Sequence, residues 1–387
     1  MFVALAATAG CSVFFGFDDL LPGPSTAPVV EASTADVSNT DAGPDAACPM
    51  GFDDCDDEPG CETSITGTDP ANCGACKRTC GSAACVNGAC SPEVIATENA
   101  LSVAADSTGV YWSTLAVDAG ADAEPEGEII RAAPDGGSRT VVATAESQTG
   151  TGAIALDATH VYWGTTTDKV RRAPKAGGPV ETLDLALTAG GVSRLAVGNE
   201  TVFATIRAGT NTGRIDAVPL SGGASTSIAS NQEQPYGIVV DPQHVYWVSQ
   251  GSVAGSARIT QALHDGGSAI SIPSNGVQPQ YIATDGERVY WTHATAGDGL
   301  WAGTLPLTAG GGVVKLFGGA PGRGVAVDAN HVYWSTETSI ERIRKDGTKH
   351  AYLAKLPSGT TREIAIDDAW VYFVIQTAPL RVARTPK

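Results

Sequence analysis

The sequence predicts an all-β protein: a seven-bladed β-propeller closed by an N-terminal strand, with a small disulfide-rich module in front of it. Three observations lead to this prediction. A segment of the form apolar-Ala-apolar-Asp, followed by Val-Tyr-Trp, recurs between residues 92 and 387. Eight of the nine cysteines lie between residues 48 and 90. The 46 glycines and only 17% charged residues favour many turns and short strands over a bundle of helices.

The repeat is clearest at its aspartate, which opens a tight turn before the Val-Tyr-Trp strand. Successive anchor positions are 51, 41, 43, 44, 43 and 39 residues apart. A period of roughly 40 to 45 residues indicates repeated supersecondary units. In the third copy a glycine stands where the others have aspartate. The anchors are Asp106, Asp157, Gly198, Asp241, Asp285, Asp328 and Asp367.

Each unit is expected to form four short strands. The apolar strand runs to the aspartate, and the β-branched and aromatic residues after the turn favour a second strand. A third strand, such as Ile129–Ala132, ends in a glycine turn, such as Asp135-Gly-Gly. Glycine supplies the positive φ that such turns require. A fourth strand, such as Thr140–Ala143, completes the unit.

The two ends of the repeat region complement each other. The seventh unit stops after its third strand, at Lys387, while the segment Glu93–Thr97 resembles the fourth strand Thr140–Thr144. The N-terminal strand would therefore complete the last blade and leave no exposed edge. This arrangement predicts a closed seven-bladed propeller over residues 92–387.

The cysteines in front of the repeats form an even, dense set, which is typical of a disulfide framework made in an oxidising compartment. Eight cysteines allow 105 pairings, so the connectivity stays open. Zinc is the alternative, because Cys73 and Cys76 have ligand spacing, but all six histidines lie at or beyond His160 and a site would need four thiolates. The predicted disulfide cysteines are Cys48, Cys55, Cys61, Cys73, Cys76, Cys80, Cys85 and Cys90.

The first 47 residues give an expectation about location. Residues 1–11 resemble the end of a bacterial lipoprotein signal peptide, which implies lipidation of Cys11; the alternative is a plain secretory signal with a spare thiol. Residues 12–47 read as a disordered acidic tether rich in Ser, Thr, Ala and Pro. Residues 48–91 resemble short Cys-rich modules of bacterial surface proteins. We expect a lipid-anchored protein of the bacterial envelope, periplasmic or surface-exposed, or else a secreted one.

The formal net charge of −18 comes mainly from this front end, since residues 1–91 hold 13 Asp and Glu against Lys77 and Arg78. The charge argues against nucleic acid as a partner, and contact with a membrane is expected only through the lipid. No apolar run reaches the roughly 18 residues of a membrane-spanning helix. The carboxylates of residues 53–62 lack the spacing of a known calcium loop, so solvated acidic loops are expected and no metal or cofactor is predicted.

The units resemble the YWTD repeats of lipoprotein-receptor propellers, with apolar-Ala-Val-Asp, then Tyr-Trp, then Asp-Gly. Two departures stand out. The residues after Tyr-Trp are Ser-Thr, Gly-Thr, Val-Ser, Thr-His and Ser-Thr, so the family's second Asp is missing, and the family usually has six blades against the seven counted here. The resemblance implies the propeller fold and is not carried over to receptor partners.

Residues that recur in every copy are expected to be architectural. His160, His244 and His331 share one repeat position, and the Tyr-Trp pairs are expected to pack between blades. Function is expected where the copies differ, on the side of the ring with the second-to-third-strand loops and the blade-to-blade connections, which we call the variable face. The alternative for these residues is solvated loop charge. The candidates are Arg194, Tyr236, Tyr281, His293, Arg323, Arg362 and Glu363.

We expect a noncatalytic, envelope-tethered monomer that binds a protein or glycan partner through the variable face, and we assign no catalytic residue. The alternative is a propeller-type hydrolase, lactonase or lyase that uses Glu363, His293 and Asp298 at the channel mouth. A purely structural stalk is a third possibility. Three or more unpaired Glu, Asp or His side chains within metal-ligand reach at one mouth would favour the enzyme.

Overall fold

In this computed structural model the chain divides into two units, Met1–Thr40 and Asp41–Lys387. All described residues belong to the second unit. The predicted signal segment with Cys11, the tether, and Cys48, Cys55, Cys61 and Cys76 lie outside them. The structure describes residues 52–53, 63–64, 67–74, 77–114, 127–145, 153–165, 169–185, 190–198, 200–209, 211–253, 255–276, 278–308 and 311–387. None of their elements is a helix that could cross a membrane.

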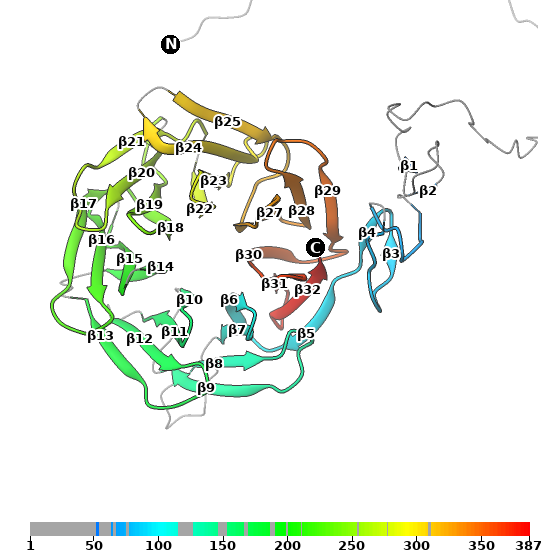
Figure 1. Ribbon diagram of the computed structural model, residues 1–387, viewed down its shortest axis with the longest axis horizontal. Helices are drawn as coiled ribbons and strands as arrows, with labels where there is room; N and C mark the ends of the chain where they lie inside the picture. Colours follow the sequence, from blue (N-terminus) through cyan, green and yellow to red (C-terminus); the bar gives the residue numbers. More distant parts are fainter. Residues whose placement is uncertain are drawn as a thin grey trace, which may run out of the picture. The chain divides into compact units, whose positions relative to one another are not determined.

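The ring of blades is the main feature of the described chain, and it confirms the predicted seven-bladed propeller (Figure 1). Strands follow each other outward from the centre in chain order. The first three blades are β6 (Ala100–Asp106), β7 (Gly109–Thr114), β8 (Gly127–Ala132) and β9 (Thr140–Ala145); β10 (Ile154–Leu156), β11 (His160–Gly164), β12 (Lys169–Pro174) and β13 (Glu181–Asp184); and β14 (Gly191–Gly198), β15 (Thr201–Arg207), β16 (Gly213–Pro219) and β17 (Thr226–Gln232).

The remaining blades keep the same order, except that the last one takes its outer strand from the other end of the repeat region. They are β18 (Pro235–Val240), β19 (His244–Ser249), β20 (Arg258–Leu263) and β21 (Ile270–Pro273); β22 (Pro279–Thr284), β23 (Arg288–His293), β24 (Leu300–Thr308) and β25 (Gly311–Phe317); β26 (Val325–Val327), β27 (His331–Ser335), β28 (Ser339–Arg344) and β29 (Ala351–Lys355); and β30 (Thr360–Ile366), β31 (Trp370–Gln376), β32 (Arg381–Pro386) and β5 (Glu93–Thr97).

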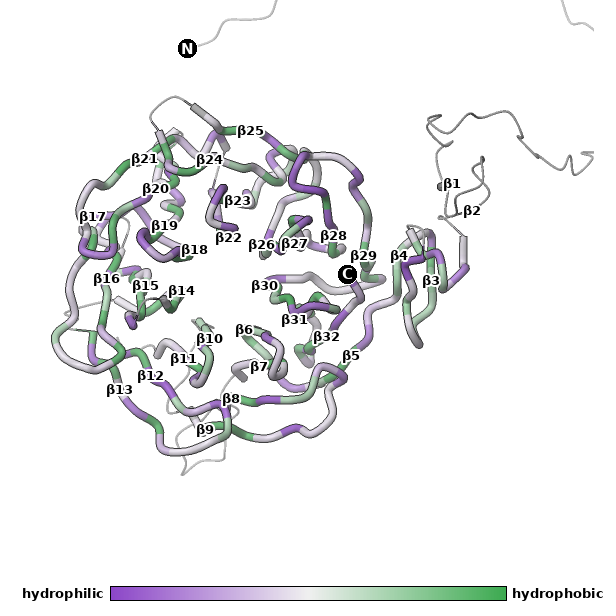
Figure 2. The backbone as a smooth tube through the Cα atoms, in the orientation of Figure 1, coloured by the Kyte–Doolittle hydropathy of each residue, from purple (hydrophilic) through white to green (hydrophobic). Residues whose placement is uncertain are grey.

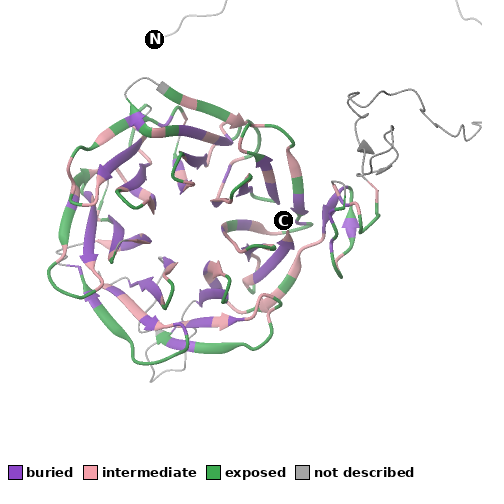
Figure 3. Ribbon diagram, viewed as in Figure 1, coloured by how far each residue is buried: buried purple, intermediate pink, exposed green. Residues whose placement is uncertain are grey.

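The ring closes as the sequence predicts. Strand β5 pairs antiparallel with β32, with Thr97 opposite Arg381 and Ala96 opposite Val382. The seventh blade is therefore built from both ends of the repeat region, and its outer edge is covered. Figure 2 shows apolar residues alternating with polar ones along the blades. Figure 3 shows the outer strands as the most exposed, and burial is greatest in the second strand of each blade, such as β7 and β19.

The repeated aromatic residues fill the spaces between neighbouring blades. Tyr111 of the first blade packs with Trp163 of the second, and Tyr372 of the seventh packs with Trp112 of the first. All four side chains are at most 1% exposed. Apolar contact between blades, rather than a ligand cage, is therefore the role of the Tyr-Trp pairs, and it continues around the closed ring.

In five blades the repeated aspartate ties its own turn to its own tyrosine, whereas in the first blade the Tyr111 hydroxyl meets the Thr108 hydroxyl instead. In the fourth blade Asp241 Oδ1 accepts hydrogen bonds from the backbone N–H groups of Gln243 (2.8 Å) and His244 (2.7 Å), and Oδ2 accepts one from the Tyr246 hydroxyl at 2.6 Å. In the third blade both partners are replaced together, since Gly198 stands for the aspartate and Phe203, which has no hydroxyl, for the tyrosine. The turn aspartate and the buried tyrosine thus form one structural unit.

Lysines join some blades to the blade before them on the face of these turns. Lys345 of the sixth blade lies with Nζ 2.8 Å from Oδ2 of Asp285 in the fifth. Lys387 of the seventh lies 3.0 Å from Oδ2 of Asp328 in the sixth, and Lys175 pairs with Asp106 in the same way. These lysines follow the third strand of their blades, so one repeat position supplies all three ion pairs.

The described part of the Cys-rich module is held by the disulfides Cys73–Cys85 and Cys80–Cys90. The disulfide prediction is confirmed for these four residues, and the zinc alternative is wrong for them. Strands β1 (Phe52–Asp53) and β2 (Thr63–Ser64) pair with each other. Strands β3 (Cys85–Val86) and β4 (Ala89–Cys90) extend the sheet of the sixth blade, where Cys90 pairs in parallel with Ala354.

A buried arginine joins the module to the ring. The guanidinium of Arg78, a residue 5% exposed, donates hydrogen bonds to the backbone carbonyl oxygens of Cys73 (2.8 Å), Leu353 (2.7 Å), Tyr352 (3.3 Å) and Pro386 (3.4 Å). Burial lowers the pKa of Arg78 to about 10. Its acceptors belong to the module, to the sixth blade and to the seventh, so the guanidinium of Arg78 is hydrogen-bonded to all three.

Candidate functional site

The inner strands vary from blade to blade near their start, while the apolar residues that follow repeat, and one of the variable positions holds most of a polar cluster. It lies four residues before the anchor position, near the start of each inner strand and thus toward the variable face. Such a position is where a ring of similar units acquires a specific site. From the first blade to the seventh it holds Ser102, Ala153, Arg194, Gly237, Tyr281, Gly324 and Glu363.

Backbone irregularities coincide with this position. The pairing of the inner strand with its neighbour shifts register between Val192 and Arg194 in the third blade and between Pro279 and Ile282 in the fifth. Similar shifts occur at the start of the inner strands of the first, fourth and seventh blades. A β-bulge changes the direction of a side chain, and bulges are common beside functional sites.

Arg194 is the centre of a polar network drawn from different blades. Its Nη2 donates hydrogen bonds to the hydroxyl oxygens of Tyr236 (2.7 Å) and Tyr281 (2.5 Å). Its Nε lies 3.7 Å from Oε1 of Glu363, whose other oxygen accepts a hydrogen bond from the Ser102 hydroxyl. We call these five residues the Arg194 network. They come from the third, fourth, fifth, seventh and first blades.

Ring stacking reinforces the network. The Arg194 guanidinium carbon lies 4.4 Å from the centroid of the Tyr236 ring and 4.9 Å from that of Tyr281. The two rings meet edge to face, with centroids 5.6 Å apart. Cation–π contacts of this kind strengthen when water is excluded. The arrangement fixes the two hydroxyl oxygens on one guanidinium.

Burial and charge set the titration of the network. The side chains of Arg194 and Glu363 are 12% and 14% exposed. Burial raises the pKa of Glu363, although Arg194 and Ser102 favour its ionised form. Burial alone would lower the pKa of Arg194, but its interactions with Tyr281, Tyr236 and Glu363 outweigh burial and raise that pKa. The positive charge of the network is therefore firmly held.

The hydrogen bonds within the network determine which donors and acceptors a ligand could use. Because Arg194 donates to the oxygens of Tyr236 and Tyr281, each hydroxyl keeps its own hydrogen to donate elsewhere. The Glu363 carboxylate accepts from Ser102 and faces the cation. The network presents polar groups in a fixed geometry and holds its carboxylate in an ion pair.

The structure brings four of the seven predicted site residues into the network and places the other three elsewhere. Arg323 Nη2 lies 3.0 Å from Oε1 of Glu337, in the loop between the second and third strands of the sixth blade. The Arg362 side chain is exposed, and its carbonyl oxygen accepts hydrogen bonds from Gly324 N and Ser335 Oγ. Both arginines are thus on the variable face but make different contacts from Arg194.

His293 is fully buried at the end of β23 and is not a mouth residue. Its ring meets the Trp301 ring edge to face at 6.1 Å, and neither ring nitrogen makes a hydrogen bond within the described residues. Burial lowers its pKa to about 4, against the opposing charge of Asp298. The expectation that His293 lines the mouth is wrong, because this repeat position is buried in every blade. Its counterparts are Thr114, Thr165, Ile206, Ser249, Thr336 and Ile375.

The three residues of the catalytic alternative do not form one cluster, because Glu363 lies apart from the other two. Glu363 belongs to the Arg194 network, whereas His293 and Asp298 both contact Trp301: the His293 ring packs against it, and the Asp298 backbone oxygen accepts its indole N–H (2.7 Å). In the part of the chain that the structure describes, the only His, Cys, Asp or Glu side chains grouped closely enough for a metal ion are Cys73, Cys80 and Cys90. Disulfide bonds occupy all three.

Sequence reasoning missed two features of this face. Ser102 was not a candidate, although it shares the variable position with Arg194 and Glu363. A cavity of about 210 Å³ also lies between the fourth-blade loop Gln250–Ala257 and the connection Gly276–Gln278 to the fifth blade. The loop stood out in the sequence as an insertion, but the connection facing it did not.

No family model and no curated protein matches the chain. Solved structures that resemble it include a streptogramin B lyase (TM-score 0.58, 13% identity, 75% of this chain and 94% of that one) and the virginiamycin B lyase of Staphylococcus aureus (0.58, 12%, 76% and 97%). A nidogen/laminin complex also matches (0.48, 18%, 65% and 97%). At 12% and 13% identity the two lyase likenesses show the propeller fold alone.

Proposed function

We propose that the chain is a noncatalytic binding protein whose variable face docks a protein or glycan partner, with the Arg194 network at the centre of the contact. The observation that carries this proposal is a bonded polar cluster built from two adjacent repeat positions that differ from blade to blade. Ser102, Arg194, Tyr281 and Glu363 occupy one of these positions in four blades and bond to one another. A repeat that keeps its packing residues but varies at this position and at the one before it, which holds Tyr236, gives the ring a unique polar centre.

The chemistry of the network favours recognition over turnover. Glu363 is paired with a buried guanidinium and a serine hydroxyl, so its charge is already compensated. The tyrosine hydroxyls offer donors on rigid aromatic rings, which lose little conformational freedom on binding. Half-buried Arg323 and exposed Arg362 precede the variable position in the sixth and seventh blades and supply charge at the rim. Rim charge contributes mainly to association rate and specificity.

The proposal places the protein outside the cytoplasm, tethered to the envelope through Cys11. The two disulfides support an oxidising compartment, because paired cysteines persist there. Mass spectrometry of the N-terminal peptide purified from membranes tests the tether. Acyl mass on Cys11 supports it, and an unmodified Cys11 on a soluble protein contradicts it.

The binding function is tested by capture. The immobilised full chain is exposed to a detergent extract of the envelope of the encoding organism and to a glycan array. The double variant Arg323→Ala/Arg362→Ala removes rim charge from the variable face, and Arg344→Ala/Lys349→Ala removes two exposed cations from the turns of the opposite face. Capture that the first variant weakens and the second does not supports the proposal. Capture that is equal in both variants, or absent from the wild type, overturns it.

A further inference from the structure

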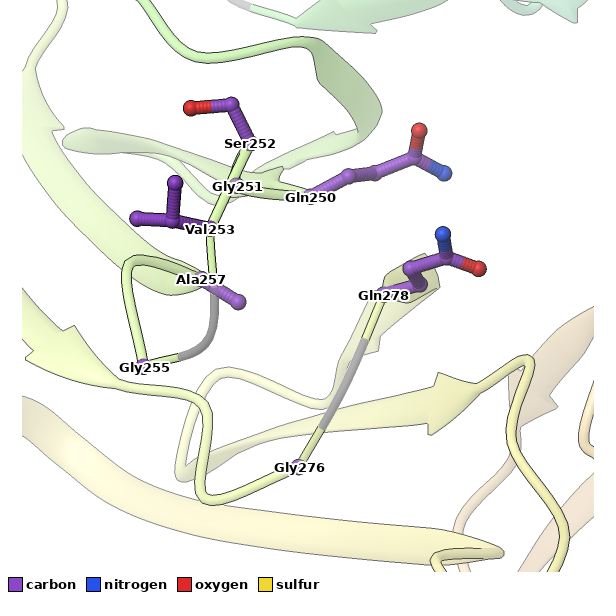
Figure 4. A pocket seen from close by; sticks show the side chains of 8 residues that line it. All are labelled: Gln250, Gly251, Ser252, Val253, Gly255, Ala257, Gly276 and Gln278. Carbon is purple, nitrogen blue, oxygen red and sulfur yellow. The ribbon is translucent and has the colours of Figure 1, made fainter. Parts of the chain in front are cut away.

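The cavity between the fourth and fifth blades has an uncharged, mixed lining. Eight residues line it, and none of them bears a charged side chain. The amide ends of Gln250 and Gln278 point to the same side of the space (Figure 4). Val253 adds apolar surface at the rim, with 69% of the residue exposed. The remaining lining residues are Gly251, Ser252, Gly255, Ala257 and Gly276.

Three of the lining residues make close backbone contacts. Gly251 has a φ of +76°, and a Cβ there would meet Ser256 Oγ at 2.5 Å, so only glycine fits. A Cβ on Gly276 would lie 2.6 Å from Nε2 of His293, so this lining glycine packs directly against the buried imidazole. The carbonyl oxygen of Gln278 accepts the N–H of Ala294 at 3.1 Å, and this contact holds its backbone while the side chain stays exposed.

The charged side chains near the cavity, Arg258 and Glu233, bond to the backbone of the fourth-blade loop. Arg258 Nη1 donates to the carbonyl oxygens of Gly255 (2.6 Å) and Ala257 (3.0 Å). Glu233 accepts the N–H of Ser252 at 3.1 Å. These contacts brace both ends of the loop, so the interior is left to amide and backbone groups. A charged ligand would meet no opposite side-chain charge on the lining.

We propose that this cavity binds one neutral sugar ring, such as the terminal hexose or N-acetylhexosamine of a glycan. The inference rests on the proposed function, whose ligand class it narrows to carbohydrate. A sugar hydroxyl both donates and accepts hydrogen bonds, and each glutamine amide offers one acceptor and two donors to match it. The apolar C–H face of the ring suits Val253. A volume of about 210 Å³, the space of about seven waters, accommodates a single sugar ring.

The test measures binding of the full chain to the methyl glycosides of glucose, galactose, mannose and N-acetylglucosamine by saturation-transfer NMR. Each glycoside is titrated to about 20 mM, because this concentration range covers the weak affinities of single sugar rings. Gln250→Ala and Gln278→Ala each remove one amide. Gln243→Ala removes an exposed glutamine in the turn of the opposite face and is the matched control. Circular dichroism verifies that the three variants keep the fold.

We expect at least one glycoside to bind, with affinity about fivefold weaker in each cavity variant and unchanged in the control, because each variant loses one or two hydrogen bonds. No binding to the wild type, or equal binding by all variants, overturns the sugar site. If the glycosides fail while capture from the envelope extract still depends on the variable face, the sugar site is wrong and the binding function stands. If both fail, the binding function is wrong as well.

Discussion

Arg194 of the third blade donates a hydrogen bond to the hydroxyl of Tyr281 in the fifth blade, 2.5 Å away. The same guanidinium stacks on Tyr236 of the fourth blade, which lies between them in the ring, and pairs with Glu363 of the seventh. The polar centre of the variable face therefore forms only when these blades are in their closed arrangement. The geometry of the site therefore depends on closure of the ring.

Removing Arg194 should leave Glu363 buried without its cation. We expect Arg194→Met to lower the free energy of unfolding by about 3 kcal/mol, because breaking a buried pair leaves an uncompensated charge. Glu363→Gln should recover part of this loss in the double variant. Chemical denaturation of the wild type, both single variants and the double variant forms the cycle that measures the coupling. Additive losses would show that the two side chains do not interact.

The lowered pKa of Asp328 predicts that the folded protein loses stability in acid. Burial alone would raise the pKa of Asp328, but hydrogen bonds from Asn330, His331, Lys387 and Tyr333 outweigh it and hold that pKa well below its usual range. A carboxylate with a depressed folded pKa stabilises the protein above its unfolded pKa of about 3.9, and this contribution is lost as the pH falls further. Denaturation between pH 7 and pH 2 should show the loss. Asp328→Asn should be less stable at pH 7 and show a shallower decline below pH 4; an unchanged decline contradicts the assignment.

The lowered pKa of His293 predicts a second decline of the free energy of unfolding, at milder pH. Its pKa is lowered to about 4 by burial, so the folded chain binds a proton less readily than the unfolded chain does at about 6.5. Stability should therefore fall by about 3 kcal/mol as the pH drops from 6.5 to 4. His293→Leu removes the titrating group and should flatten this range specifically. A slope that is the same in the variant would mean that His293 is protonated in the folded protein.

The hydrogen bonds of Arg78 are expected to stabilise the attachment of the Cys-rich module to the sixth and seventh blades. Arg78→Met leaves the carbonyl oxygens of Cys73 and Leu353 without their donor, and we expect a loss of about 2 kcal/mol together with faster proteolysis of residues 77–91. Arg139→Met, which changes an arginine with a 43% exposed side chain, is the matched control. Identical digestion rates for the two variants would show that Arg78 does not hold the module on the ring.

The ring was predictable because each blade repeats the same local chemistry. Turn aspartate, buried Tyr-Trp and glycine turn recur at a constant period, and the extra strand Glu93–Thr97 matched the strand that was missing at the other end. Two further regularities were also visible in the sequence. Lys175, Lys345 and Lys387 share one repeat position, and Gly198 and Phe203 replace the bonded aspartate and tyrosine of the third blade together.

The site was predictable only in part. Arg194, Tyr236, Tyr281 and Glu363 were identified as residues that break the repeat, but their mutual bonds depend on how seven blades curve around one axis. Residues 194 and 363 are brought together by that curvature and not by local sequence. His293 was placed wrongly because it was read as an isolated polar residue. Aligned with Thr165 and Ile206, it occupies a position that the fold always buries.

The affinity of the captured partner for the full chain, measured by titration, tests the central claim most directly. Tyr236→Phe/Tyr281→Phe removes only the two hydroxyls held by Arg194, while Tyr352→Phe removes one from the outer strand β29 and serves as the control. We predict at least about tenfold weaker binding by the double variant and wild-type binding by the control. Equal affinity of all three proteins would contradict the claim that the Arg194 network is the centre of the binding face.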